Sequence, residues 1–360
     1  MSRRQADQKY ELTKKIGEGA FGAVFSAKVK TTKQKVVAIK MTETEKSKRE
    51  MYMLEKIKTS GIKSKFIAGH SDSFERGPMI FIVMELMKTT LWEVIDGEDG
   101  MFPLHAIRVV SKQILLGLSA LHSMGIVHND LKPDNVMLVD HEKYPYQVKI
   151  IDFGGAVHED FEEGATRYMQ SQAYIAPESN INYIVGPKSD MWAHAVILLD
   201  MILKKMFFEA YSPPEATYQH YQLMGNPSLK FRKMMKDRLM EHFTSKVVPI
   251  FDDKEKAKKR KDSQPETIDD IHNHLLGEGR DEKDVKGLDG YLRRMLTWDP
   301  NDRISVDDGL KCEWLNPDTF EDQKYAREAK GYFRKARLEL PSRKRKIDKE
   351  DDKENKRPAN

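Results

Sequence analysis

Hydrophobic and polar positions alternate along residues 10–40, on either side of a glycine-rich turn, and this period of two is typical of β-strands. Over residues 46–58 the spacing changes, because Met51, Leu54 and Ile57 recur every three residues and predict the apolar face of a helix. A nearly continuous apolar run, M-I-F-I-V-M-E-L-M at 79–87, is typical of a buried strand. The first part of the chain is therefore predicted to be small and rich in strands.

Helical patterns dominate the rest of the chain. After Pro103 the apolar positions follow a helical spacing, and residues 190–204 predict a second, strongly apolar helix. A short strand, Q-V-K-I-I, precedes Asp152. Together these elements predict an α+β fold with a small antiparallel β-sheet lobe at 10–87 and a larger, mostly α-helical lobe at 88–315.

Composition narrows the class of protein. The 360 residues are 39% hydrophobic and 33% charged, as in soluble globular chains with well-solvated segments. The net charge of +4 is too small to predict nucleic-acid binding, and no apolar run is long enough and free enough of charge to predict a membrane span. Residues 1–9 form a polar extension without the apolar segment of a secretory signal. Cys312 is the only cysteine, so an intrachain disulfide is impossible, which fits a reducing compartment.

Two charged stretches depart from the globular pattern. Residues 225–287 lack long apolar periods and contain K-A-K-K-R-K at 256–261, so they predict a charged insert in the larger lobe. Residues 316–360 form a charged tail, and we expect disorder from about residue 340, since so few apolar side chains cannot offset chain entropy. K-A-K-K-R-K and the S-R-K-R-K of the tail resemble nuclear import signals, although solvated surface explains them equally well. The expected location is cytoplasmic, nuclear or both.

The most informative stretch is H-N-D-L-K-P-D-N at 128–135, which contains Asp130, Lys132 and Asn135. An aspartate can orient a hydroxyl and accept its proton, a lysine can neutralise charge on a transferring phosphoryl group, and an asparagine can offer an amide oxygen to Mg²⁺. The alternative is a polar loop after a helix, with Pro133 as a turn residue. The spacing of the three groups favours phosphoryl transfer.

Gly17, Gly19 and Gly22 in G-E-G-A-F-G-A-V can bring backbone N–H groups close to phosphate oxygens, because glycine permits tight turns. The same pattern occurs in dinucleotide-binding proteins, where it opens a helix. Here the glycines lead into a second strand-like run beginning near Val24, which favours a hairpin over the phosphates.

Lys40 ends the apolar run V-A-I-K, and a lysine in an apolar strand is costly to bury unless it is paired. An exposed lysine on an edge strand is the alternative. The predicted partner is Glu50, because Leu54 lies four residues later on the same helical face. Glu55 is the rival, but it would place Thr59 where an apolar residue is expected.

Asp152 in I-I-D-F-G-G follows a buried strand and precedes two glycines. That position suits an aspartate that chelates Mg²⁺ at the mouth of a cleft, and a simple Asx turn has the same signature. Farther along come A-Y-I-A-P-E, S-D-M-W and D-P-N-D-R. Glu178 and Arg303, from the first and last of these, are predicted to form a buried structural ion pair.

In this order the motifs resemble those of the eukaryotic protein kinases, over about residues 10–315. The resemblance implies the bilobal protein-kinase fold, with ATP and Mg²⁺ in the cleft, protein substrates, catalytic Asp130 and Lys132, and metal ligands Asn135 and Asp152. It also implies that Met84 is the gatekeeper and that residues 85–87 are the hinge. The ATP-binding residues that it implies are Ile16, Gly17, Glu18, Gly19, Ala20, Phe21, Gly22, Val24, Ala38, Lys40, Glu50, Met84, Glu85, Met87 and Met137.

Lys132, two residues after Asp130, resembles the serine/threonine branch of these kinases, in which Ser171 would place a hydroxyl against the catalytic aspartate. The chain departs from the family at Asn129, where the usual residue is an arginine that binds a phosphate on the activation segment. We therefore expect activity that does not depend on this phosphate. Thr166 and Tyr168 occupy the spacing of the T-x-Y of mitogen-activated kinases, and coincidence is the favoured explanation of this match. No subfamily is assigned.

Two functions follow from this resemblance. The first is an active serine/threonine protein kinase, favoured because the catalytic set is complete. The second is a pseudokinase that acts as a binding scaffold, for which the insert and the tail would suit. A dinucleotide-binding protein is a distant third, since its glycine loop needs a following helix. The oligomeric state and the physiological substrates cannot be predicted from these residues.

Overall fold

The computed structural model describes residues 9–19, 22–32, 35–97, 102–140, 146–158, 170–181, 185–233 and 267–316. Several features of the sequence lie outside the described residues: Ala20 and Phe21 at the tip of the glycine-rich turn, Thr166, Tyr168, the basic run 256–261 and the tail from residue 317 onward.

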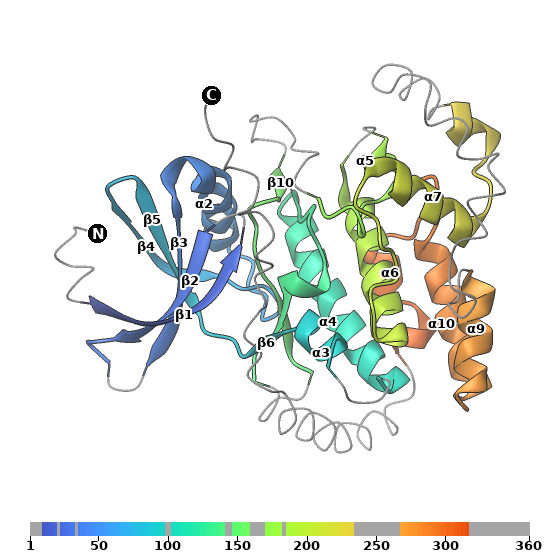
Figure 1. Cartoon of the computed structure of the whole chain (residues 1–360), viewed down its shortest axis with the longest axis horizontal. Coiled ribbons are helices and arrows are strands. Elements are labelled where there is room, and N and C mark those ends of the chain that lie inside the picture. The colour runs from blue at the N-terminus through green and yellow to red at the C-terminus, as the bar shows by residue number, and fades with distance from the viewer. Residues whose placement is uncertain are drawn as a thin grey trace, which may run out of the picture.

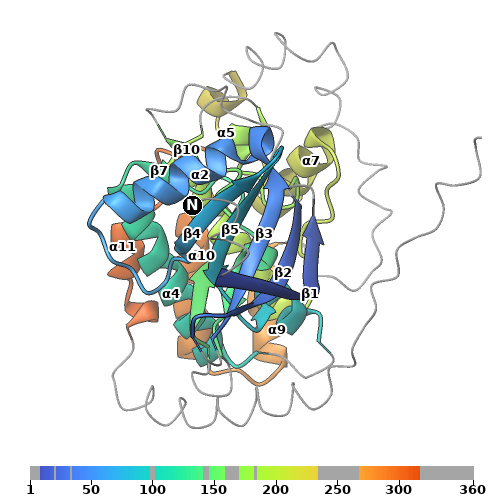
Figure 2. The ribbon, with the colours of Figure 1, turned by 90° about the vertical axis from the view of Figure 1, so that its left-hand side faces the viewer.

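The small lobe is a five-stranded antiparallel sheet with the strand order β1-β2-β3-β5-β4 (Figures 1 and 2). Its strands are β1 (Tyr10–Gly19), β2 (Gly22–Val29), β3 (Val36–Glu43), β4 (His70–Arg76) and β5 (Met79–Glu85). Successive side chains point to opposite faces of the sheet. Ile39 therefore packs with Phe81 and Val83 in an apolar cluster on one face, whereas Lys40 and Ile82 lie on the other.

Helix α2 (Thr44–Thr59) provides the apolar partners for Ile82 on that second face. Met53 and Leu54 are buried there and belong to the same cluster as the core of the large lobe. The amphipathic pattern predicted this helix over 46–58, and the observed helix is slightly longer at both ends. Because it packs on the sheet face that carries Lys40, its side chains can reach the cleft.

The large lobe is mostly helical, as the sequence predicted, and the boundary between the lobes lies between Glu85, the end of β5, and Thr89, the start of the next strand. Its helices are α3 (Leu91–Ile95), α4 (Leu104–Ser123), α5 (Pro177–Asn180), α6 (Pro187–Leu203), α7 (Pro213–Met224), α9 (Ile268–Gly277), α10 (Glu282–Met295) and α11 (Val306–Leu310), with short helices η1 (Pro133–Asn135) and η5 (Glu313–Leu315). Its strands are β6 (Thr89–Thr90), β7 (Ile126–Val127), β8 (Val136–Leu138), β9 (Val148–Ile150) and β10 (Val157–His158). The prediction of a two-lobed α+β fold is confirmed.

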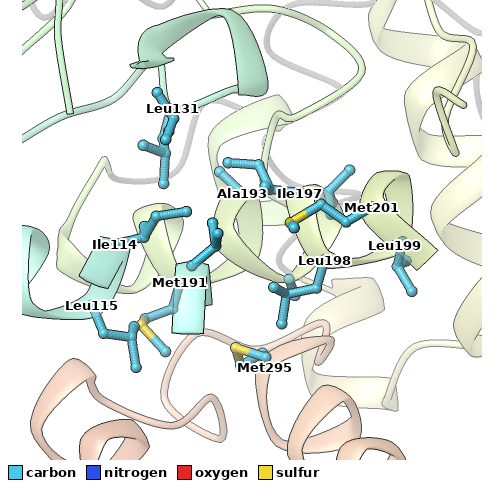
Figure 3. Close-up of a cluster of buried hydrophobic side chains, with 14 of the residues drawn as sticks. Ile114, Leu115, Leu131, Met191, Ala193, Ile197, Leu198, Leu199, Met201 and Met295 are labelled. Carbon is cyan, nitrogen blue, oxygen red and sulfur yellow. The ribbon is translucent and has the colours of Figure 1, made fainter. Parts of the chain in front are cut away.

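Helix α6 is buried on all sides from Ser189 to Ile202, and the rest of the large lobe is arranged around it. Figure 3 shows its apolar side chains facing Ile114 and Leu115 of α4, Leu131 of the catalytic loop and Met295 of α10. Helix α4 is long and apolar enough to cross a membrane by length and composition, yet 61% of that stretch is buried inside the molecule. Such packing is what a core helix of this lobe shows.

The C-terminal part of the predicted charged insert, 225–287, packs against the core of the large lobe. Helix α9 and the start of α10 fall inside it, and Ile271, Leu275 and Val285 are buried in the main core. The sequence did not indicate these two helices because their few apolar residues are separated by acids and lysines. Their apolar positions still recur at three- and four-residue spacing, and that stripe is enough to dock both helices.

Candidate active site

The sheet places the residues of the nucleotide-binding prediction in cross-strand rows. Gly17 pairs with Val24, and Val24 pairs with Lys40 on the next strand. Ala38 pairs with Met84, and Met137 lies half-buried on β8 in the large lobe. Rows of small and apolar side chains suit a flat aromatic ring, whereas the row that ends at Lys40 suits phosphates.

The structure gives the local conformation of the glycine-rich turn and the contacts of the hinge. Gly22 has φ +128°, and an added Cβ would lie 2.2 Å from the carbonyl oxygen of Met41, so only glycine fits there. Ile16, Glu18 and Gly19 lie on β1, and the side chain of Ile16 is exposed. At the hinge, Met87 is half-buried, and the carboxylate of Glu85 forms an ion pair with Lys149 of β9. This contact ties the hinge to the large lobe.

Lys40 lies at the centre of a group of buried charges. Its Nζ is 2.8 Å from Oε2 of Glu50 on α2 and 3.1 Å from Oδ1 of Asp152 in the large lobe. Burial lowers the pKa of Lys40, but the two carboxylates more than reverse this and hold that pKa above its usual value. The lysine is therefore charged, and it links three segments that are distant in the sequence.

Glu50, not Glu55, is the partner of Lys40. The side chain of Glu55 is 55% exposed and lies 3.9 Å from both Lys58 and His70. The preference for Glu50 was based on helical spacing alone, and the structure confirms it. The prediction worked because a face containing Leu54 is buried against the sheet.

Asp130, Lys132 and Asn135 are close together in the catalytic loop, as their spacing predicted. The Nζ of Lys132 donates to Oδ2 of Asp130 at 3.0 Å, and the Nδ2 of Asn135 donates to the same oxygen at 3.1 Å. Burial raises the pKa of Asp130 above its usual value, and the charge of Lys132 limits the rise. A carboxylate with a raised pKa is a better proton acceptor than a free one.

Asn135 and Asp152 fit a divalent cation. The Nδ2 of Asn135 faces two acceptors, the backbone oxygen of Asp130 at 2.7 Å and its carboxylate, so its amide oxygen points the other way. The backbone N–H of Ile151 donates to the backbone oxygen of Asn135 at 2.9 Å, which brings the loop beside Asp152. The single positive charge of Lys40 faces two carboxylates, those of Glu50 and Asp152. The excess of carboxylates over lysine favours binding of Mg²⁺.

Asp152 also forms the Asx turn that the sequence allowed, because its Oδ1 accepts from the backbone N–H of Gly154 at 3.2 Å. Burial raises the pKa of Asp152, but Lys40 and this hydrogen bond bring it below its usual value. The carboxylate is therefore ionised, as a metal ligand must be.

The structure adds an anchor that the sequence analysis did not assign. Asp190, in the first turn of α6, accepts the backbone N–H groups of His128 and Asn129, each at 3.0 Å, and lies 2.8 Å from Nε2 of His122. The motif S-D-M-W marked this position without indicating its role. Because α6 is rigidly buried, Asp190 fixes the catalytic loop relative to the core.

Ser171 contacts Asp130 in a different way from the one predicted. Its backbone N–H, not its hydroxyl, donates to Oδ1 of Asp130 at 3.3 Å. A backbone contact leaves no trace in side-chain identity, so the sequence could not distinguish the two. The contact still brings the segment before A-P-E onto the catalytic acid.

Glu178 and Arg303 form the predicted buried ion pair. The guanidinium is bidentate, with Nη1–Oε1 at 2.6 Å and Nη2–Oε2 at 2.8 Å, and it also donates to the backbone oxygens of Lys188 and Thr297. The pair ties α5 to α6 and to the loop before α11. It differs from the group around Lys40 because one cation faces one carboxylate through two parallel hydrogen bonds.

Comparison with known proteins agrees with this geometry. The family model for the protein kinase domain matches residues 10–315. The chain belongs to the protein kinase family.

This kinase is divergent from its curated relatives. It is 27% identical over 339 residues to homeodomain-interacting protein kinase 1 of Caenorhabditis elegans, covering 85% of this chain and 40% of that protein. It is 31% identical over 200 residues to homeodomain-interacting protein kinase 2 of Mus musculus, covering 54% of this chain and 17% of that protein. It is 25% identical over 359 residues to homeodomain-interacting protein kinase 4 of Rattus norvegicus, covering 90% and 57%. The kinase thus spans between 17% and 57% of the length of these relatives.

Proposed function

We propose that this kinase transfers the γ-phosphoryl group of Mg-ATP to serine and threonine hydroxyls of protein substrates, without requiring a phosphate on its activation segment. The observation that carries the proposal is the single buried cluster in which Lys40 meets Glu50 and Asp152, beside a catalytic loop whose Asp130, Lys132 and Asn135 are mutually hydrogen-bonded. Lys132, two residues after Asp130, supports the serine/threonine class.

Each residue has a distinct task in this proposal. Lys40, held by Glu50, binds phosphate oxygens, while the amide oxygen of Asn135 and the carboxylate of Asp152 hold the metal. When bound, Mg-ATP supplies the phosphoryl group and the metal neutralises its charge. Asp130 orients the substrate hydroxyl and accepts its proton, and Lys132 neutralises the charge that develops beside it. Most of the rate enhancement comes from positioning and electrostatics.

Location and substrates belong to the same proposal. The basic runs at 256–261 and 342–346 support a cytoplasmic or nuclear location, where protein substrates meet the enzyme. The names of the relatives suggest homeodomain proteins as candidates to screen as substrates.

The proposal is tested by transfer of radiolabelled phosphate from ATP to a generic protein substrate. Asp130→Asn should lower kcat by about a hundredfold to ten-thousandfold, the range for loss of a general base. Asp134→Asn is the matched control, because it makes the same chemical change on the same loop at an exposed side chain. Equal signal from the wild type and Asp130→Asn would support the pseudokinase scaffold instead. Phosphatase treatment of the wild type should leave its activity unchanged.

A further inference from the structure

Asn129 occupies the position of the family's arginine, and its surroundings show what has replaced that residue's task. The residue is 3% exposed, and its backbone is in the left-handed region with φ +63°. Asparagine tolerates this conformation better than most residues do. Its N–H is held by Asp190, so the backbone is fixed from the α6 side and the side chain points toward the activation segment.

The side chain of Asn129 joins two other segments with a defined polarity. Its Nδ2 donates to the backbone oxygen of Gly155 at 2.9 Å, and its Oδ1 accepts from Nε2 of Gln170. A backbone carbonyl can only accept, so Gly155 determines which end of the asparagine amide faces it. The other end must then be the oxygen, which requires a donor at residue 170.

Gln170 immediately precedes Ser171, whose backbone N–H donates to Oδ1 of Asp130. Holding Gln170 therefore holds the amide that contacts the catalytic acid. Asn129, Asp130, Gln170 and Ser171 line one pocket beside this contact. Three segments meet here: the catalytic loop, the residues after Asp152 and the segment that leads into A-P-E.

We propose that the Gln170–Asn129–Gly155 amide bridge replaces the arginine–phosphate contact that positions the activation segment in other members of the family, and that Gln170 is a positioning residue for catalysis. The inference rests on the proposed function. A phosphate bound to an arginine orders a segment by opposite charge. Two neutral amides of fixed polarity connect Gly155 to Gln170 without any modification, so Gln170 and Ser171 are held against Asp130 in the unphosphorylated chain.

Asn129→Gly is the first test, because glycine accepts φ +63° without strain and removes only the side-chain bridge. We expect kcat to fall about tenfold or more, as for the loss of two hydrogen bonds that position a reacting group. KM for ATP should stay within about twofold, since the contacts of Asn129, to Asp190, Gly155 and Gln170, involve none of the residues proposed to bind the nucleotide. An unchanged kcat would overturn the proposal.

Gln170→Glu tests the polarity of the bridge. A carboxylate cannot donate to Oδ1 of Asn129, whereas the protonated acid can, and Asp130 and Asp190 line the same pocket and favour the protonated form. The kcat of this variant relative to wild type should be lowest near pH 8 and should rise several-fold as the pH falls toward 5.5. Gln172→Glu is the matched control on the same segment, and its ratio should be flat. A flat ratio for Gln170→Glu would contradict the bridge.

A double-mutant cycle and an exchange measurement complete the test. Asn129→Gly combined with Gln170→Ala should be no slower than the worse single variant, because both break one bridge, whereas multiplied effects would show that the residues act independently. Amide hydrogen exchange of Ser171 should be faster in Asn129→Gly than in wild type. That readout needs no activity, so a wild type that transfers no phosphate defeats the proposed function alone, and unchanged exchange defeats the bridge alone.

Discussion

Two sets of buried charges are balanced in opposite ways: the group around Lys40 in the cleft, and the buried charges of the large-lobe core around α6, which is called the scaffold below. In the cleft, Lys40 faces two carboxylates, and the side chain of Asp152 remains 26% exposed. In the scaffold, Arg303 faces one carboxylate, that of Glu178, and both side chains are at most 2% exposed. The Glu178–Arg303 pair is balanced in charge and closed to water, whereas the cleft group has more carboxylates than lysines and is partly exposed. Unbalanced charge next to solvent marks the place where a ligand completes the set.

The largest effect on stability is expected from breaking the buried ion pair of Glu178 and Arg303. Arg303→Met leaves Glu178 buried without a counter-charge, which should lower the free energy of unfolding by about 3–5 kcal/mol. Thermal unfolding should occur roughly 10 °C lower. Arg293→Met is the matched control, since Arg293 is also an ion-paired arginine, with Asp269 and Asp289 as partners, but is 46% exposed; its cost should be about 0–1 kcal/mol. Equal losses of unfolding free energy in both variants would contradict the distinction between buried and exposed ion pairs.

Breaking the cleft group should affect catalysis more than folding. Lys40→Met should lower kcat by about a hundredfold to thousandfold, the range for loss of one preorganised charge or donor at the reacting group. Its unfolding temperature should fall by less than that of Arg303→Met, because Asp152 can be solvated and because burial already raises the pKa of Glu50, which can take up a proton once Lys40 is gone. Steady-state kinetics and scanning calorimetry on the same preparation measure both. A Lys40→Met protein that unfolds as readily as Arg303→Met would blur the comparison.

The residual negative charge of the cleft predicts stabilisation by metal and nucleotide together. Mg²⁺ with ADP at 100 times the dissociation constant should stabilise the wild type by about 2.7 kcal/mol. Removing the metal with EDTA should abolish the part of this shift that depends on Mg²⁺, and Asp152→Asn should have the same effect. Asp72→Asn, at an ion pair with Lys9 on the small-lobe sheet, should retain the full shift. Thermal shift with and without Mg²⁺ is the measurement.

The smallest effect concerns Asp200, a carboxyl group of the large-lobe core that has no cation beside it among the described residues and that burial favours in its protonated form. Asp200 on α6 accepts from the hydroxyl of Tyr174 at 2.6 Å and from the N–H of Phe207 at 2.7 Å, and burial raises its pKa to about 7. Because the folded state holds this proton more tightly than the unfolded state, its contribution to stability is full below about pH 4 and is lost as the pH rises through about 7.

Asp200→Asn mimics the protonated form, so it should remove that pH dependence. At pH 8 the variant should be more stable than wild type by roughly 1–2 kcal/mol, as expected when a buried group no longer has to ionise. At pH 5 the two proteins should be nearly equal. Urea denaturation across this range measures the difference, and parallel curves for both proteins would show that Asp200 is ionised throughout.

Sequence patterns predicted the parts of the site that depend on neighbours in the chain. The spacing of Asp130, Lys132 and Asn135 within one short loop limits how far apart they can lie, and all three meet in the structure. Helical period alone selected Glu50 over Glu55, since Leu54 had to face the core. The order of motifs indicated the two-lobed fold. Charged residues obscured the apolar stripes of α9 and α10, so the sequence did not indicate that these helices of the predicted insert dock on the core.

The sequence by itself therefore determined the fold class and the chemistry of the cleft, because those depend on periodicity and on short-range spacing. Only the tertiary structure decided how the cleft is held in place. Asp190 reaches Asn129 across 61 residues and Gln170 reaches it across 41, and no local pattern connects such positions. The contacts depend on backbone groups, on the direction of amide dipoles and on a left-handed turn at Asn129, which arise only when distant segments pack against the same buried helix.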